Sequence, residues 1–419
     1  MTEGDKQPDG YIAVRIAELA AALAAENGPA DGGAQAWADV FRLLSALMRH
    51  EGQTRLESLH ALYDPLDPDA PPTRRDLGLP AFERFEQILL GELARGNFTE
   101  IDPESVRTAE ATKRLTGLAI KPSLAGIRRI RYFARGARSE SFTFKSWFGL
   151  RKQEIKVEQM RDVVVLVGFK ADAEISKVDA KAFARMRRGV RPGAVLVKHF
   201  RNVAAPELVT LHPGARPSMR RRDQVWLAAP AIVAGAPVLI NLWPALTVLA
   251  AVLAAYFGAQ GVIEESELKR AIAAISGLVA VGAFVMRQRL KYEAQTLRYQ
   301  KRLADTVYFR NLANNAGVID LLAGASAEQD TKEAMIAYAA LRKAAHALTK
   351  AEIDQAAETF LHERFGLQVN FDIHDALEKL ERLGLVARAG EAFEALAPAA
   401  ALARHAGAWA ALFQFSTRR

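Results

Sequence analysis

An uncharged run of 40 residues, 224–263, constrains the fold of this chain more than any other feature. It is about twice as long as the roughly 20 apolar residues that one bilayer crossing requires. Three prolines interrupt it, at Pro230, Pro237 and Pro244. The run favours a membrane-inserted segment, and the alternative is a helical hairpin buried inside a large soluble domain.

The apolar segments around this run predict a transmembrane hairpin over 225–288. We expect a stretch near the membrane interface at 225–237 and a first span at about 239–260. A second span at about 269–287 contains an apolar core of only 16 residues. Basic residues at its two ends can reach the interface and lengthen it to a full crossing.

Basic residues flank the predicted hairpin, whereas the loop between the spans is acidic. By the positive-inside rule, this asymmetry places both termini and both long soluble parts on the cytoplasmic side of the cell (inner) membrane. The juxtamembrane basic residues are Arg220, Arg221, Arg222, Arg287 and Arg289.

The formal net charge of +8 conceals a stronger local excess. Between Thr108 and Asp223 there are 26 Lys or Arg against 10 Asp or Glu, so this segment carries +16 and the remainder −8. An excess of this size predicts an anionic neighbour, lipid headgroups or nucleic acid. The chain has no cysteine, which excludes disulfides and thiolate chemistry.

Periodicity predicts an α+β membrane protein with a helical N-terminal region, a small basic β-containing unit, the two-span hairpin and a C-terminal helical, winged-helix-like unit. Helical spacing recurs at 34–50 and 81–96, and strand-like runs recur at 127–135, 162–170 and 193–200. The expected divisions are a flexible tail 1–10, a helical region 11–115, a basic α+β unit 116–223, the hairpin 225–288, a long helix with a polar corner and second helix 289–346, and a winged-helix-like unit 347–419.

The polar stretch 308–330 follows a segment without glycine or proline that is predicted to extend the second span as a helix. Asn314, Asn315 and Gly317 tolerate a left-handed turn, so we expect them to end that helix. Ser326 precedes Gln329 by three residues, the spacing of a capping box that starts the next helix. We therefore predict that the stretch forms a corner between two helices.

A second interpretation of this corner is a ligand or partner site. Arg310, Asp320 and Glu328 could form a buried ion pair or a polar binding surface there. The residues of the corner are Tyr308, Phe309, Arg310, Asn311, Asn314, Asn315, Gly317, Asp320, Glu328 and Gln329.

Two helices and a hairpin are predicted after Lys350. Thr349 and Glu352 form a capping box, Gly366 and Gly384 end the two helices, and Gly390 turns the hairpin. This is the element order of a winged helix, which binds DNA in many proteins. From Lys350 onward, however, the chain has 8 basic and 10 acidic residues. We therefore expect a protein partner and not nucleic acid.

No motif indicates catalysis, a cofactor or a metal. The eight histidines have no zinc-ligand spacing, and no phosphate-binding loop or nucleophile elbow is present. The carboxylates of YDPLDPD, 63–69, lack the loop glycine and closing glutamate of an EF-hand, so this motif reads as a turn.

Several segments together resemble the transmembrane protein 143-like family, also known as domain of unknown function 3754. They are YDPLDPD at 63–69, RGNFTEI at 95–101, the stretches 197–224 and 308–341, and VNFDIHDALEKLERLGLV at 369–386. The resemblance extends from about residue 10 to 385. It implies a two-span membrane protein with bacterial and organellar relatives, and it implies no reaction.

We therefore expect a membrane-anchored, non-enzymatic adaptor or scaffold that rests on anionic lipid and binds a protein through its C-terminal unit. The alternative is an oligomeric pore or transport accessory, because Ala273 and Gly277 allow close helix packing and self-association. A third hypothesis is a membrane-bound enzyme that uses Arg310, Asp320 and Glu328.

Overall fold

The structure is a computed structural model of the full chain. It describes residues 10–27, 33–71, 78–102, 119–121, 126–146, 151–177, 190–211, 216–218, 309–344 and 346–412, with scattered positions at 180–184 and 247–297. The chain divides into two compact units. Unit 1 comprises residues 1–106, 124–208 and 310–419, and unit 2 comprises 107–123 and 209–309.

Long amphipathic helices form the frame of unit 1. They are α1 (Ile16–Asn27), α2 (Gly33–Tyr63), α3 (Gly78–Arg95) and α8 (Ala316–Lys343). In α2 the buried residues Trp37, Phe41, Leu44 and Met48 recur every three or four positions, so one face is apolar along the helix. The predicted N-terminal helices are confirmed.

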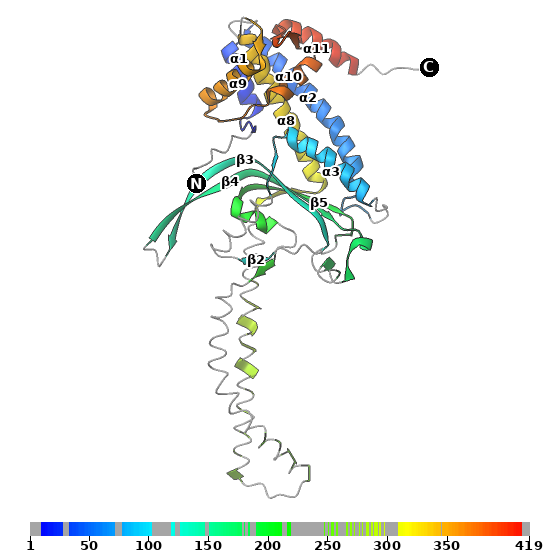
Figure 1. The fold of residues 1–419 in the computed structure, drawn as a ribbon, viewed down its shortest axis with the longest axis vertical. Coiled ribbons are helices and arrows are strands. Elements are labelled where there is room, and N and C mark those ends of the chain that lie inside the picture. The colour runs from blue at the N-terminus through cyan, green and yellow to red at the C-terminus, as the bar shows by residue number, and fades with distance from the viewer. Residues whose placement is uncertain are drawn as a thin grey trace, which may run out of the picture. The chain divides into compact units, whose positions relative to one another are not determined.

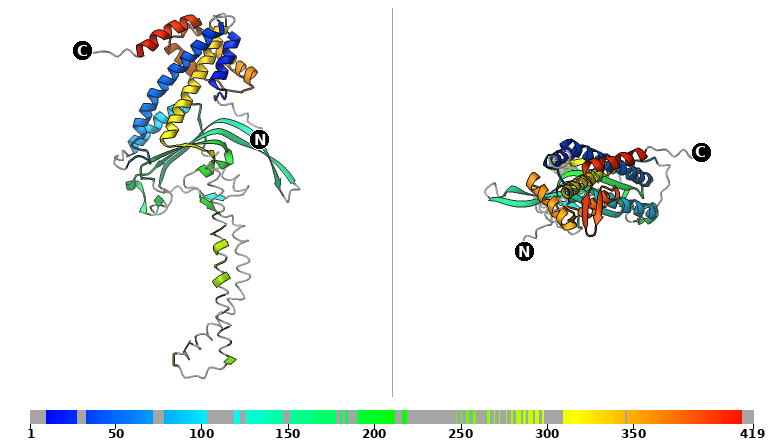
Figure 2. Two further views of the ribbon diagram at one scale, coloured as in Figure 1. Left: turned by 180° about the vertical axis from the view of Figure 1, so that it is seen from behind. Right: turned by 90° about the horizontal axis from the view of Figure 1, so that it is seen from above.

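A five-stranded antiparallel sheet lies against α2, α3 and α8 (Figures 1 and 2). Its order is β1-β3-β4-β5-β7, and its strands are β1 (Thr99–Glu100), β3 (Ile127–Ser146), β4 (Arg151–Phe169), β5 (Val195–Ala204) and β7 (Asn311–Asn314). Short 3-10 helices occupy Asp172–Glu174 and Ala205–Leu211. The three predicted strand runs are confirmed.

The C-terminal elements have the order and pairing of a winged helix. They are β8 (Leu348–Thr349), α9 (Lys350–Phe365), α10 (Ile373–Arg382), β9 (Val386–Ala389) and β10 (Ala392–Ala395), with sheet order β8-β10-β9. The Thr349 side chain accepts a hydrogen bond from the Glu352 amide, and Gly366 ends α9 in a left-handed conformation, as predicted. A further helix, α11 (Pro398–Leu412), follows.

Unit 1 has two hydrophobic cores, and α2 and α8 contribute residues to both of them. One core contains Trp37, Phe41 and Tyr338 together with residues of α9 and α10. The other contains Tyr63 and Ile319 with residues of α3 and the sheet. The residues of α8 between these cores, 326–333, are mostly polar and nearly all buried. This polar band is the feature that positions the candidate site.

The prediction of a two-span membrane protein is wrong for the part of the chain that the structure describes. Within the residues that the structure describes, no helix is both long enough and apolar enough to cross a membrane. The long described helices α2 and α8 carry charged side chains along their length. The expected spans, 239–260 and 269–287, lie largely outside the described residues.

Unit 2 is described at only a few positions. β2 (Ala119–Lys121) and β6 (Arg216–Ser218) pair antiparallel, with Ile120 opposite Pro217. Arg287 and Arg289 are exposed, and Arg289 pairs with Glu293 one helical turn later at 3.1 Å. Arg220, Arg221 and Arg222 lie outside the described residues.

One packing prediction concerns Gly168 in β4. A Cβ atom at this position would lie 2.7 Å from the Phe82 ring of α3, so Gly168→Ala is expected to lower the free energy of unfolding by about 1–3 kcal/mol. A Cβ atom at Gly324 of α8 would meet no heavy atom within 4 Å, so Gly324→Ala is expected to stabilise the helix by up to about 1 kcal/mol. Urea denaturation measures the free energy of unfolding of both variants. A change in the same direction in both would contradict this packing.

Candidate functional site

Charged, amide and hydroxyl side chains from four helices and one loop meet between the two cores. We call this set the polar junction. Its members are Glu51 and Arg55 of α2, Glu92 of α3, Asn97 of the α3–β1 loop, Ser326, Gln329, Asp330, Lys332 and Glu333 of α8, and Asp375, Lys379 and Arg382 of α10.

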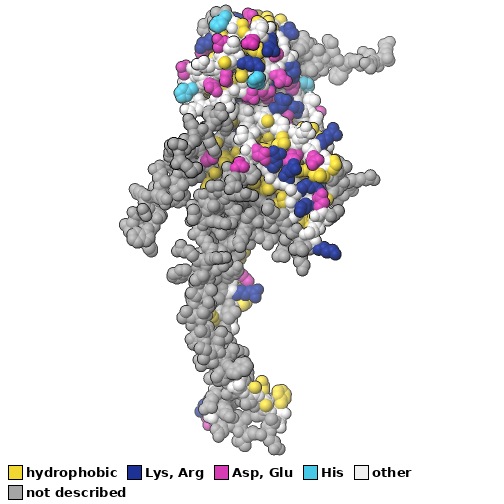
Figure 3. Space-filling view, in the orientation of Figure 1, with side chains coloured by type: hydrophobic (Ala, Val, Ile, Leu, Met, Phe, Trp, Pro, Cys, Tyr) yellow, Lys and Arg dark blue, Asp and Glu magenta, His cyan; other side chains and the backbone are white. Residues whose placement is uncertain are grey.

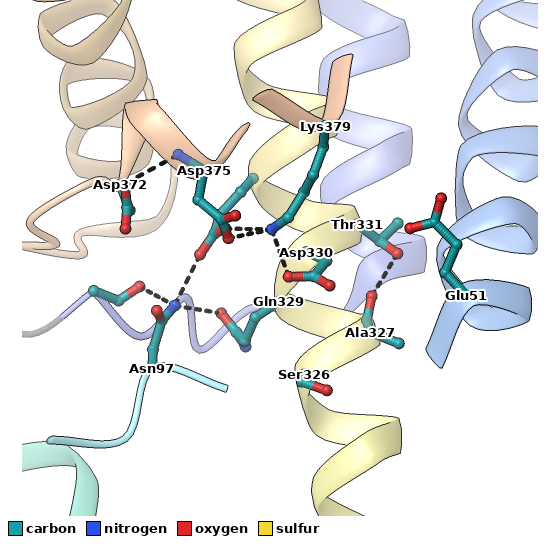
Figure 4. Close-up of polar contacts among 12 residues, drawn as sticks. Glu51, Asn97, Ser326, Ala327, Gln329, Asp330, Thr331, Asp372, Asp375 and Lys379 are labelled. Atoms are coloured by element: carbon teal, nitrogen blue, oxygen red, sulfur yellow. Dashed lines mark hydrogen bonds and ion pairs between the residues drawn. The ribbon is translucent and has the colours of Figure 1, made fainter. Parts of the chain in front are cut away.

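Lys379 is the centre of the polar junction. Its Nζ lies 2.5 Å from Asp330 Oδ1 and 3.4 Å from Glu333 Oε2, and it also contacts Asp375, one turn earlier on α10. Figure 4 shows the lysine extended between Asp375 and Asp330. The Lys379 side chain is only 3% exposed. Each carboxylate thus reaches the same buried ammonium group.

Burial and charge pull the pKa values of this cluster in opposite directions. Burial alone would lower the pKa of Lys379, but Glu333, Asp330 and Asp375 together raise it. Burial raises the pKa of Asp330 despite the attraction of Lys379. Burial also raises the pKa of Glu333 to about 8. One lysine therefore does not compensate the desolvation of all its carboxylate partners.

Two arginines extend the junction toward α2 and α3. Arg55 Nε lies 2.6 Å from Glu92 Oε1, and its Nη2 lies 3.3 Å from Asp330 Oδ2. Ser326 Oγ donates to Glu92 Oε2 at 2.6 Å. At the exposed end, Arg382 makes a bidentate pair with Glu51, at 2.5 and 2.9 Å. Together these pairs connect α10 and α8 to the middle of α2.

An extended segment, residues 10–15, runs beside α8, and we call it the N-terminal strap. The Gln329 side chain accepts from the Ile12 amide at 3.1 Å and donates to the Ile12 carbonyl at 3.4 Å. Lys332 Nζ donates to the same carbonyl at 3.1 Å. Because Ile12 itself is fully buried, the strap is held by both its backbone and its side chains.

Asn97 links the strap to the carboxylate cluster. Its backbone has a φ of 57°, a left-handed conformation that asparagine adopts more readily than most residues. Its Nδ2 donates to Gly10 O at 2.8 Å and to Glu333 Oε1 at 2.9 Å. Glu333 therefore contacts the loop that holds the strap on one side and Lys379 of α10 on the other.

A second buried charge centre lies on the sheet at Asp162. The carboxylate accepts from Arg135 at 3.0 Å, lies 3.2 Å from His199 Nε2 and accepts from Arg201 at 3.3 Å. Burial would raise the pKa of Asp162, but the hydrogen bond with His199 and the charge of Arg135 hold it well below its usual range. Asp162 is thus an ionised acceptor.

Arg135 connects this centre to the strap. Its guanidinium lies 4.5 Å from the ring centroids of both Tyr11 and Phe98 and donates to Gly96 O at 2.8 Å. Cation–π contacts of a desolvated guanidinium contribute on the order of 1–2 kcal/mol. Strap, sheet and α3–β1 loop are therefore joined at one place.

The polar corner predicted at 308–330 has a different structure. Asn311–Asn314 is strand β7, which pairs with β5, and is not the end of a helix. Asn315 has a φ of 52° and begins α8. Ser326 lies inside α8, where its hydroxyl donates to Glu92 Oε2, so the predicted capping box is wrong. The helix begins eleven residues earlier, with its N-cap at Asn315, and buries apolar residues from Val318 onward.

The remaining corner residues do not assemble into one site. Arg310 pairs with Glu207, Asp320 lies 2.8 Å from His60 Nε2, and Glu328 lies 2.6 Å from Lys332 Nζ. Phe309 and Asn314 are exposed, and Gly317 is half-buried. Tyr308 lies outside the described residues. Among the ten corner residues, Gln329 belongs to the polar junction.

Asn315 joins two of the sequence motifs. Its Nδ2 donates to Asp69 Oδ2 at 2.6 Å, and its backbone amide donates to Val197 O at 2.6 Å. The Asp69 amide in turn donates to Asp67 Oδ1 at 2.9 Å. The motif YDPLDPD is therefore a turn, as its composition predicts, and the structure adds that it connects the start of α8 to β5.

The carboxylates of the junction have the spacing of a cation site but already hold a cation. Asp330, Glu333 and Asp375 each place an oxygen within 4.8 Å of the others. Lys379 Nζ contacts all three. The side-chain ammonium group thus occupies the position that a metal ion would take.

Sequence reasoning missed most of the polar junction. Asp375 and Lys379 stand four apart on α10, and Asp330 and Glu333 stand three apart on α8, which are spacings of neighbours on one helix face. Such pairs are usually solvated. The available signal was the position of Lys379 between buried Ala376 and Leu380, on the apolar face of an amphipathic helix.

The described residues thus define an α+β protein with winged-helix-like C-terminal elements and buried ionic centres. Residues 160–317, less than half of the chain, match the model of a family described as a protein of unknown function (DUF3754). This region includes β5, β7 and, from the Asp162 centre, Asp162, His199 and Arg201, and it is a domain of unknown function. No curated protein and no solved structure matches the chain.

Proposed function

We propose that this protein is a non-enzymatic, protein-binding scaffold whose partner is a basic protein segment that contacts the acidic face of the winged-helix-like elements. The observation that carries this proposal is the orientation of the basic side chains of α10. Lys379 is buried against Asp330 and Glu333, and Arg382 is paired with Glu51. Lys379 is therefore not free to contact a nucleic-acid phosphate, and Arg382, whose side chain is 52% exposed, is already paired with a carboxylate.

The outward side of these elements is acidic. The exposed carboxylates are Glu352, Glu363, Asp372, Glu378, Glu381, Glu391 and Glu394. They outnumber the exposed arginines, Arg364, Arg382 and Arg388. Figure 3 shows acidic side chains among those exposed on the upper part of unit 1. A recognition helix that binds DNA needs Lys or Arg toward the phosphates, and an acidic face repels them. Opposite charge favours association with a basic protein segment.

The internal pairing of the buried charges also favours a scaffold over an enzyme. In the described part of the chain, the charged groups at Lys379 and at Asp162 form ion pairs with neighbouring side chains. Such networks fix the relative positions of helices and strands. A fixed platform presents its binding face without reorganisation, which reduces the entropic cost of association.

Site-specific photocrosslinking tests the proposal. A photoreactive residue placed at Glu378 or Glu394 is expected to capture the same protein, and the same group at exposed Glu57 on α2 is not. The charge-reversed variant Glu381→Lys should abolish capture from position 378, because it repels a basic partner. Capture of nucleic acid at 378, or equal capture from all three positions, would contradict the proposal.

We further propose that the domain of unknown function is related to the transmembrane protein 143-like family. The structure supports this where it joins two motifs of the resemblance, Asp69 of YDPLDPD and Asn315 of the 308–341 stretch, at 2.6 Å. Joint retention of this pair across members of that family would support the relation, and independent variation of the two positions would contradict it.

A further inference from the structure

The charges of the polar junction do not balance. Four of its carboxyl groups, those of Glu92, Asp330, Glu333 and Asp375, share two cations, Arg55 and Lys379. The other two cations of the junction, Lys332 and Arg382, pair with Glu328 and Glu51. Asp330 and Glu333 are 1% and 2% exposed. Unpaired negative charge at such depth is costly, and a buried carboxyl group avoids this cost by retaining a proton.

Glu333 has the weakest contact with a cation. Asp330 is 2.5 Å from Lys379 and 3.3 Å from Arg55, and Glu92 is 2.6 Å from Arg55. Asp375 contacts Lys379 and is partly exposed. Glu333 is 3.4 Å from Lys379, and its other oxygen accepts from the neutral amide of Asn97. Glu333 is therefore the carboxyl group best placed to hold a proton.

The position of Glu333 links three elements of the fold. Asn97, which binds Glu333 Oε1, also holds the strap at Gly10 O. Lys379 on its other side belongs to α10. We propose that Glu333 is the proton-binding residue of a latch that holds α10 and the N-terminal strap against α8, firm when Glu333 is protonated and weakened when it is ionised.

The direction of the pH effect follows from the groups that face Glu333. These are Asp330 from α8, Asp375 and Lys379 from α10 and neutral Asn97 from the α3–β1 loop, while Arg55 of α2 acts through Asp330. Burial raises the pKa of Glu333 from 4.5 to about 8. The stabilising contribution is therefore complete below about 4.5 and is lost as the pH rises through about 8.

Urea unfolding of the full chain from pH 5 to 9 tests the latch. Relative to Glu333→Gln, which stays neutral, the unfolding equilibrium constant of the wild type is expected to rise by up to about tenfold per pH unit within this window. The matched control is Glu328→Gln, because Glu328 is a half-exposed carboxylate on the same helix. Its pH profile should run parallel to that of the wild type.

A second measurement uses the wild-type protein alone, so it does not depend on the folding of any variant. In protein labelled with carbon-13 at glutamate carboxyl groups, the Glu333 resonance should report a protonated group at pH 6 and titrate near neutral to alkaline pH. An ionised Glu333 at pH 6 would overturn the proposal. Equal pH dependence of the wild type and Glu333→Gln would overturn it as well.

Discussion

Lys379→Met is expected to lower the free energy of unfolding by about 3–5 kcal/mol, the usual cost of removing one partner from a buried ion pair. Methionine has a similar length and retains the apolar contacts of the lysine stem. Asp330, Glu333 and Asp375, however, lose their common cation. The effect should be larger at pH 8 than at pH 5, because the pKa of Glu333, raised to about 8, favours its neutral form at pH 5.

The control for this prediction is Lys343→Met. Lys343 also pairs with a glutamate, Glu26, but its side chain is 64% exposed. An exposed pair contributes less than about 1 kcal/mol because water and salt screen it. Urea unfolding of both variants measures the contrast. Similar losses for Lys379→Met and Lys343→Met would show that the buried cluster does not stabilise the fold as described.

Asp162→Asn is expected to cost a similar amount, about 3–5 kcal/mol. The substitution keeps the shape of the side chain but removes the charge that faces Arg135, whose side chain is 8% exposed. Arg135 then remains as a buried cation between the rings of Tyr11 and Phe98. His199, which is also buried, loses its charged partner.

The pH dependence of the Asp162 contribution has the opposite sign to that of Glu333. The pKa of Asp162 lies well below its unfolded value of 3.8, so its stabilising contribution is present above that value and is lost as the pH falls below it. Acid unfolding of the wild type should therefore be steeper than that of Asp162→Asn. Glu174→Gln, which alters the 43% exposed partner of Arg128, should change stability by less than about 1 kcal/mol. Equal losses in Asp162→Asn and Glu174→Gln would contradict the buried centre.

Local sequence signals predicted the elements that depend on local interactions. The capping box at Thr349, the glycine that ends α9 and the strands rich in Val and Ile are all decided within a few residues. The same reasoning failed at Ser326. Its spacing to Gln329 fits a capping box, yet the hydroxyl donates to Glu92, 234 positions away. A contact between residues so far apart produces no pattern in the local sequence.

The polar junction could not be predicted for the same reason. A polar run such as 326–333 normally lies in water, because burying it without partners is costly. Its partners come from α2, α3, α10 and the strap, so that Ile12 and Lys332 are 320 positions apart. Sequence periodicity does not identify these partners. The charge count of the C-terminal unit, by contrast, did indicate its acidic face.

Hydrogen exchange on the full chain tests the central claim that α10 is fixed to α8 by the polar junction. We predict that amides of α10 around Lys379 are protected as strongly as those of α8 around Glu333, because both open in one cooperative unit. In Lys379→Met the protection of α10 should fall more than that of α8. If α10 in the wild type exchanges much faster than α8, the winged-helix-like elements are not held by this cluster.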